Sequence, residues 1–175
     1  MYKRQIKSIV VDVRNTSEGM MEYAAKVIDL FVPLATEGNK AIALAVNKKG
    51  DTVETFTSDA KDYAGQICVL VNRNTQGPAE LFACDLRDFD KAQLIGEITK
   101  GNGKRQQVFN LSDGGAIVLT TASILPYKSE SFDGVGVAPD VEVALTQEQL
   151  EQLEILPHDQ DCLLYTSDAA DEARS

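Results

Sequence analysis

The chain has 175 residues, 43% of them hydrophobic and 25% charged, which is enough for one domain with a core and too few for two. A net charge of −10 excludes nucleic acid and anionic membranes as favoured partners, since both need a surplus of Lys and Arg, and no apolar run reaches the roughly 18 residues that cross a membrane. A single histidine and three cysteines without metal-ligand spacing exclude a zinc site and a Ser/His or Cys/His dyad in the body of the domain, so we expect no metal and no cofactor.

Both ends of the chain look foreign to the rest. Residues 1–5, Met-Tyr-Lys-Arg-Gln, and residues 162–175, which begin Cys-Leu-Leu-Tyr-Thr-Ser, resemble translated adapters of a sequencing library. Such segments are left out of fold prediction. We therefore predict one core domain over residues 6–161, cut from a longer parent, and read nothing from the lack of a signal peptide.

The chain opens with an apolar strand followed by an amphipathic helix. Ile6–Val13 is short and rich in Val and Ile, as are strands buried on both faces of a parallel sheet. A helix is predicted over Glu18–Val32, with Ser17 as its cap. Ala41–Val46 and Thr52–Thr57 flank a polar turn and predict a hairpin. The expected buried face of the helix consists of Met21, Ala24, Ala25, Ile28 and Phe31.

A second strand and helix follow the hairpin. Gln66–Val71 is a continuous apolar strand, and Pro78–Phe89 is a helix that begins with Pro at its first position after Gly77. Its expected core residues are Leu81, Phe82, Leu86 and Phe89. The remaining predicted elements are a strand at Gln93–Gly96, a hairpin of Gln107–Leu111 with Ala116–Ala122, and a helix at Gln147–Leu153 capped by Thr146.

The order of elements predicts an α/β fold. Alternating strands and helices favour parallel β-α-β units with flanking helices, to which the hairpins are added. Ligands of such sheets lie beyond the carboxyl ends of the strands, where helix N-termini offer backbone N–H groups. Two corners of the sequence meet this description, Arg14–Gly19 and Asn72–Glu80.

A series of short motifs occurs in a fixed order along the chain. The motifs are Val11-Asp12-Val13-Arg14-Asn15, Val69-Leu70-Val71-Asn72, Glu80, Gly96-Glu97, Gly101, Gly103, Gln106, Leu111-Ser112-Asp113-Gly114, Leu119-Thr120-Thr121-Ala122 and Gly134-Val135-Gly136-Val137-Ala138-Pro139-Asp140. Together they resemble the tail-specific, or C-terminal processing, serine peptidases. The resemblance covers nearly all of residues 6–143 and implies a layered ClpP/crotonase-like sheet without a cofactor. It also implies a peptide or protein C-terminus as the ligand, and a bacterial parent that is extracytoplasmic or membrane-anchored.

The resemblance also assigns roles to positions. The family's nucleophilic serine lies three residues before the glutamate that matches Glu80, and its lysine base lies 25 residues after the serine, so these positions are Gly77 and Asn102. Gln106 matches the residue that orients the lysine in some members. The oxyanion-loop positions are Glu18, Gly19 and Pro78, with Ser17-Glu18-Gly19 standing where the family usually has Pro-Gly-Gly.

Two substitutions remove the groups that peptide hydrolysis requires. An acyl-enzyme mechanism needs a side-chain oxygen that attacks the carbonyl and a base that takes its proton. Gly77 has no side chain, and the amide of Asn102 has no basic lone pair. We therefore predict a pseudopeptidase that binds peptide or protein C-termini without cleaving them.

Other interpretations of the sequence remain open. Thr75 and Lys104 keep a spacing similar to the lost pair and could form a displaced dyad in an active peptidase, although Lys104 and Arg105 are also expected as a solvated rim. Asp12 and Glu80 could be paired acids, but structural roles at the ends of their elements are favoured. The layer fold alone would also suit a crotonase-type acyl-CoA enzyme, for which no motif is visible.

Overall fold

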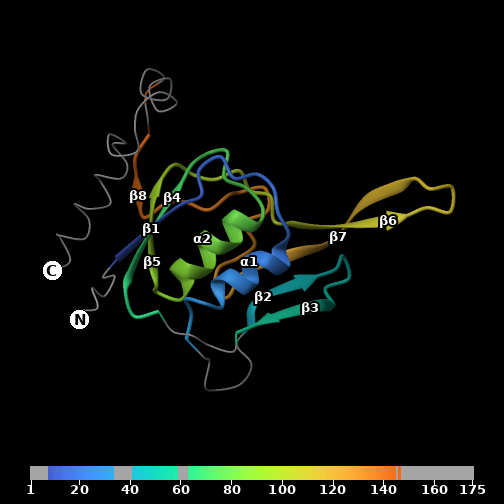
Figure 1. Ribbon diagram of the computed structural model, residues 1–175, viewed down its shortest axis with the longest axis horizontal. Helices are drawn as coiled ribbons and strands as arrows, with labels where there is room; N and C mark the ends of the chain where they lie inside the picture. Colours follow the sequence, from blue (N-terminus) through green and yellow to red (C-terminus); the bar gives the residue numbers. More distant parts are fainter. Residues whose placement is uncertain (1–7, 34–40, 59–62, 145, 147–175) are drawn as a thin grey trace, which may run out of the picture.

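The computed structural model describes residues 8–33, 41–58, 63–144 and 146 (Figure 1). The predicted helix at Gln147–Leu153 and the adapter-like ends, residues 1–5 and 162–175, lie outside the described residues.

Two four-stranded sheets and two helices make up the described fold. The parallel sheet has the strand order β1-β4-β5-β8, and the antiparallel sheet has the order β3-β2-β7-β6. The elements are β1 (Ser8–Asp12), α1 (Met21–Ile28), β2 (Ala41–Val46), β3 (Thr52–Thr57), β4 (Gln66–Val71), α2 (Pro78–Asp88), β5 (Ala92–Gly96), β6 (Lys104–Asn110), β7 (Ala116–Leu125) and β8 (Val141–Glu142). The predicted α/β class with parallel β-α-β units and added hairpins is confirmed.

The core lies around the two helices, which Figure 1 shows between the parallel sheet and the β2–β3 hairpin. The apolar faces of α1 and α2 contribute to one cluster with side chains of β2, β4 and β5. A smaller cluster, Cys68, Leu70 and Ile95 with Val141 and Val143 packed against it, covers the opposite face of the parallel sheet. Strand β4 is therefore buried on both faces, as its continuous apolar sequence predicts.

Three details of the prediction are wrong. β1 is only half-buried, with Val10 40% exposed, because among the described strands it lies at the edge of its sheet and pairs only with β4. Helix α1 is much shorter than expected: its N-cap is Met20, and Ser17 does not cap it. The backbone φ of +135° at Gly19 is incompatible with a helix, so the preceding residues form a loop. The four leading residues of the predicted apolar face are nevertheless buried, and Phe31 packs against them.

Within the described residues, no helix combines the length and the apolar character that crossing a membrane requires.

Candidate functional site

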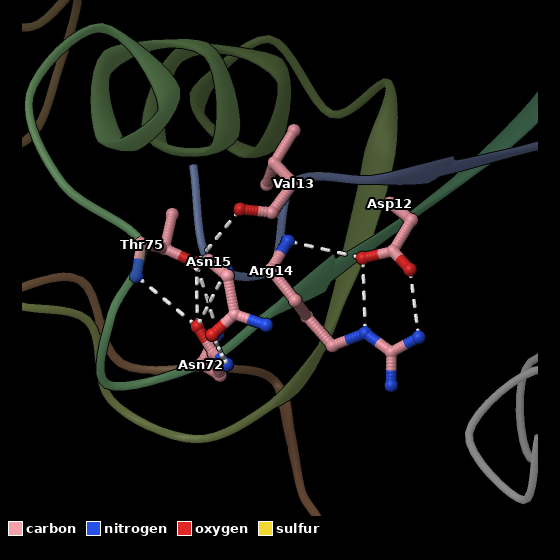
Figure 2. Close-up of polar contacts among 6 residues, drawn as sticks. All are labelled: Asp12, Val13, Arg14, Asn15, Asn72 and Thr75. Carbon is pink, nitrogen blue, oxygen red and sulfur yellow. Dashed lines mark hydrogen bonds and ion pairs between the residues drawn. The ribbon is translucent and has the colours of Figure 1, made fainter. Parts of the chain in front are cut away.

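The two predicted corners lie side by side and are tied together by side-chain amides. The backbone N–H of Asn15 donates to Oδ1 of Asn72 (3.1 Å), and Nδ2 of Asn72 donates back to Oδ1 of Asn15 (2.9 Å), as Figure 2 shows. Asn15 has a φ of +59°, a left-handed conformation that Asn adopts more readily than most residues. A backbone bond from Gln76 N–H to the carbonyl of Thr16 (3.0 Å) joins the loops again. The carboxyl ends of β1 and β4 therefore form one rigid platform.

Thr75 belongs to this platform and not to the pocket beside it. Its hydroxyl donates to the carbonyl of Val13 (3.0 Å) and accepts from the backbone N–H of Asn72 (3.0 Å) (Figure 2). The residue is fully buried. Its oxygen is thus used in joining the corners.

Helix α2 begins at a glycine with an unusual backbone. Gly77 has φ +64° and ψ −121°, a combination that L-residues adopt only under strain. A Cβ built at this position would meet only the backbone oxygen of Asn102, at 4.0 Å. There is consequently room for a side chain at Gly77, but a backbone cost for any residue that carries one.

The buried carboxylate of Glu80 holds the Asn102 loop against the start of α2. It accepts hydrogen bonds from the backbone N–H groups of Gly77 (2.9 Å), Gly101 (2.6 Å) and Asn102 (2.7 Å), and from the hydroxyl of Thr99. Glu80 has no exposed surface. Four donors around one carboxylate account for its burial and fix Gly77 and Asn102 next to each other.

Gly101 permits a close approach of two loops at this point. Its φ is +84°, and a Cβ there would come within 2.8 Å of the backbone nitrogen of Gly136 and 2.9 Å of that of Val135. Any larger residue would push the segments apart. The Asn102 loop is therefore held between Glu80 on one side and the 132–136 segment on the other.

All six site positions expected from the sequence line one pocket of about 280 Å³. These are Glu18, Gly19, Gly77, Pro78, Asn102 and Gln106. The other lining residues are Ser17, Met20, Met21, Glu22, Lys104 and Arg105. A second, mostly apolar pocket of about 290 Å³ shares Glu18, Gly19, Met20 and Pro78 with the first, and continues along α1 past Tyr23 and Val27.

The first two positions at the start of α2 offer no free backbone N–H to the pocket. The N–H of Gly77 is used by Glu80 (2.9 Å), and the next residue, Pro78, has no N–H. In hydrolases with a nucleophile at such a turn, the residue after the nucleophile supplies one of the two oxyanion donors. The exposed side chain of Glu18 lines the same pocket. The position after Gly77 therefore supplies no backbone donor, and a carboxylate side chain lies in the same pocket.

The basic side chains at the pocket differ from one another. The sequence predicts Arg105 as part of a solvated rim, and this prediction is wrong. The Arg105 side chain is 14% exposed and forms ion pairs with Glu22 of α1 (3.0 Å) and Glu54 of β3 (2.5 Å). Lys104 is about half exposed, and its ammonium lies 3.8 Å from a carboxylate oxygen of Asp133. Arg105 thus joins the antiparallel sheet to α1, whereas Lys104 remains at the surface.

Two further sequence hypotheses can be placed in the structure. Asp12 accepts three hydrogen bonds from Arg14, two of them from its guanidinium (2.9 and 2.6 Å), while Glu80 serves the start of α2. The two acids have separate partners and structural roles, as favoured from the sequence.

Ser17 was expected as a helix cap, and its place in the pocket lining was not predicted. The glycine at position 19, which has a positive φ, is the sequence signal for the later start of α1.

A family model for peptidase family S41 matches residues 1–143. The chain belongs to peptidase family S41. Its relatives include the carboxyl-terminal-processing protease of Synechocystis sp., 33% identical over 132 residues, with 75% of this chain and 30% of the relative covered. The probable CtpA-like serine protease of Staphylococcus epidermidis is 28% identical over 159 residues, with 89% of this chain and 31% of the relative covered.

A solved S41 structure gives the same result. The photosystem II D1 C-terminal processing protease superposes with a TM-score of 0.69 at 28% identity, over 79% of this chain and 35% of that one. The chain spans about a third of the length of the curated S41 relatives that it matches. The resemblance to C-terminal processing peptidases inferred from the motifs is confirmed at the level of the family and the fold.

Proposed function

We propose that this domain is a pseudopeptidase of the S41 family that binds peptides or protein C-termini and does not cleave them. One observation carries the proposal: Glu80 still fixes Asn102 beside the start of α2, while Gly77 and Asn102 offer neither a nucleophile nor a base. The scaffold of the site is thus kept without the groups that would make an acyl-enzyme.

The pockets support peptide binding without covalent chemistry. The polar pocket at Gly77 and the apolar pocket along α1 share part of their lining, so an extended chain could place a polar group in one and an apolar side chain in the other. Capture by strand addition at a sheet edge would rely on main-chain hydrogen bonds, which need no catalytic residue. By resemblance to the family, we place the parent protein outside the cytoplasm or anchored to a membrane.

The alternative is an active peptidase with relocated groups. The proposed displaced dyad is disfavoured because the Thr75 hydroxyl is buried and bonded to Val13, and because Lys104 lies at the surface near Asp133. Ser17 is the hydroxyl that lines the pocket. A fluorophosphonate probe that labels Ser17 or Thr75, located by peptide mass spectrometry, would support the alternative; an unlabelled chain supports the pseudopeptidase.

Binding is tested with two fluorescent peptides that differ only at their carboxyl end. A peptide with a free C-terminus is expected to bind more tightly than its amidated copy, as measured by fluorescence anisotropy. Equal affinity would refute recognition of C-termini, and no binding of either peptide would refute the proposal as a whole.

A further inference from the structure

Four charged side chains line the polar pocket, and three of them have a partner of opposite charge. Arg105 and Glu22 form an ion pair at 3.0 Å, and the ammonium of Lys104 lies 3.8 Å from a carboxylate oxygen of Asp133. The fourth, Glu18, is exposed, and its carboxylate has no hydrogen bond or ion pair within the part of the chain that the structure describes. Among the described residues, Glu18 is therefore the one charge of the pocket lining that no neighbour neutralises.

Glu18 stands where the polar pocket meets the apolar one. It lines both pockets, together with Gly19, Met20 and Pro78. The loop that carries it packs on the start of α2, because a Cβ built at Gly19 would lie 3.5 Å from Cγ of Pro78. A ligand that extends from one pocket into the other must therefore pass this carboxylate.

An unpaired carboxylate in a binding site favours a ligand group of opposite charge. A neutral group placed over Glu18 would take water from the carboxylate and return no hydrogen bond, whereas the side chain of a lysine or arginine supplies both charge and donors. An acidic group would be repelled. The net charge of −10 acts in the same direction, since it attracts cationic ligands to the whole surface.

Lys104 marks the other end of the path. It lines the polar pocket but not the apolar one, and its side chain is about half exposed. An ammonium group can donate to more than one acceptor, so Lys104 can receive a terminal carboxylate while it remains near Asp133. Lys104, Glu18 and the apolar pocket along α1 therefore offer places for a carboxyl end, a basic side chain and an apolar side chain, in that order.

We propose that Glu18 selects ligands that carry a lysine or arginine between an apolar residue and the carboxyl end. This inference rests on the proposed function, because it needs a peptide in the same pocket. It gives a role in specificity to a side chain that stands where the family usually has a glycine.

The first test compares three peptides with a fluorescent label at the amino end and a free carboxyl end. They end in Leu-Lys-Ala, in Leu-norleucine-Ala and in Leu-Glu-Ala, and norleucine keeps an unbranched carbon chain like that of lysine without the ammonium group. By fluorescence anisotropy at low ionic strength, we expect the lysine peptide to bind about two- to fivefold more tightly than the norleucine peptide, as is typical of one exposed charge pair. The glutamate peptide should bind most weakly, and added salt should reduce the differences.

The second test moves the charge on the protein. Glu18→Gln should erase the preference for lysine, and Glu18→Lys should shift it towards the glutamate peptide; neither change breaks a contact among the described residues. Glu130→Gln is the matched control, an exposed carboxylate that lines neither pocket, and should leave the preference unchanged.

The outcomes separate this inference from the proposed function. Equal binding of the lysine and norleucine peptides, or a preference that survives Glu18→Gln, would overturn the role of Glu18 and leave the pseudopeptidase standing. If none of the peptides binds, the proposed function fails and the selectivity fails with it.

Discussion

The carboxylate of Glu80 accepts a hydrogen bond of 2.7 Å from the backbone N–H of Asn102, from 22 residues further along the chain. The same carboxylate accepts from Gly77, so one buried side chain sets the distance between the two positions that the family uses for its chemistry. The geometry of the corner depends on Glu80 and on backbone atoms, neither of which changes when the nucleophile and the base are replaced. The corner can therefore keep its shape whatever side chains stand at positions 77 and 102.

Replacing Glu80 by Gln should destabilise the domain. In the wild type, backbone N–H groups donate to both carboxylate oxygens of Glu80. In the variant, the glutamine NH₂ group replaces one of these oxygens, so at least one buried N–H loses its acceptor. We expect a loss of about 3 kcal/mol in the free energy of unfolding, measured by urea denaturation. Glu97→Gln, which removes an ion pair with the exposed Arg73, should cost much less than Glu80→Gln because water screens that pair. Equal losses in the two variants would contradict the role given to Glu80.

Restoring the two lost groups should give little activity by itself. Gly77→Ser fits the open space at this position but must adopt a positive φ, at a cost of about 1–3 kcal/mol. With Asn102→Lys it supplies a nucleophile and a base, yet Pro78 still withholds a backbone donor. Adding Pro78→Ala to the pair should raise turnover of a fluorogenic peptide a further hundredfold or so.

The control for restoration keeps the backbone strain and omits the hydroxyl. Gly77→Ala replaces Gly77→Ser in the triple variant, and we expect no turnover from it. Cleavage at the same rate by both triple variants would show that the oxygen at position 77 is not the nucleophile. Turnover by the unmodified chain that disappears with Ser17→Ala or Thr75→Ala would contradict the pseudopeptidase itself.

Asn72 should matter through its acceptor oxygen. Oδ1 receives N–H groups from Asn15, Asn74 and Thr75, all at 3.1 Å, while Nδ2 gives one hydrogen bond. Asn72→Ala removes the acceptor of the Asn15 and Asn74 N–H groups, whereas Thr75 N–H keeps the backbone carbonyl of residue 72 (2.9 Å), and the change should lower stability by about 1–2 kcal/mol and weaken peptide binding. Asn72→Asp keeps an acceptor at the same place and should lose less. The two variants are compared by thermal unfolding and anisotropy, and an order reversed from this one would refute the assignment.

Asp85 should make stability depend on pH. Burial raises the pKa of this carboxyl well above its ordinary value of 3.8, with the charge of Asp88 adding to the effect and the N–H of Tyr127 opposing it. The folded chain therefore holds a proton that the unfolded chain releases, so this group's contribution to stability falls as pH rises above about 4, until the pKa of the folded state is passed. Asp85→Asn should remove that slope.

The measurement for Asp85 is a series of urea titrations between pH 4 and pH 8. Asp90→Asn, at an exposed carboxylate near the end of the same helix, is the control and should leave the slope unchanged. Identical slopes in the wild type and in Asp85→Asn would contradict a raised pKa for Asp85.

The sequence predicts the class of fold and the place of the site because both depend on local patterns. The apolar run of β4 and the proline at the start of α2 are patterns of neighbouring residues. The spacing from Gly77 to Asn102 comes from the resemblance to the family. Other features depend on which strands pair, and no local sequence pattern encodes strand pairing. These features are the edge position of β1, the projection of the β6–β7 hairpin and the burial of Arg105. Ser17 is a common helix-capping residue and so predicts a helix that begins at Glu18, whereas the positive φ of Gly19 delays the start of α1 to Met21.

The most direct test of the central claim follows the anisotropy of an end-labelled peptide over time after mixing with the chain. We predict a rise that stays constant for hours and is reversed by unlabelled peptide, because the peptide is bound and remains intact. A rise that decays as labelled fragments accumulate, or no rise at any concentration, would contradict the account.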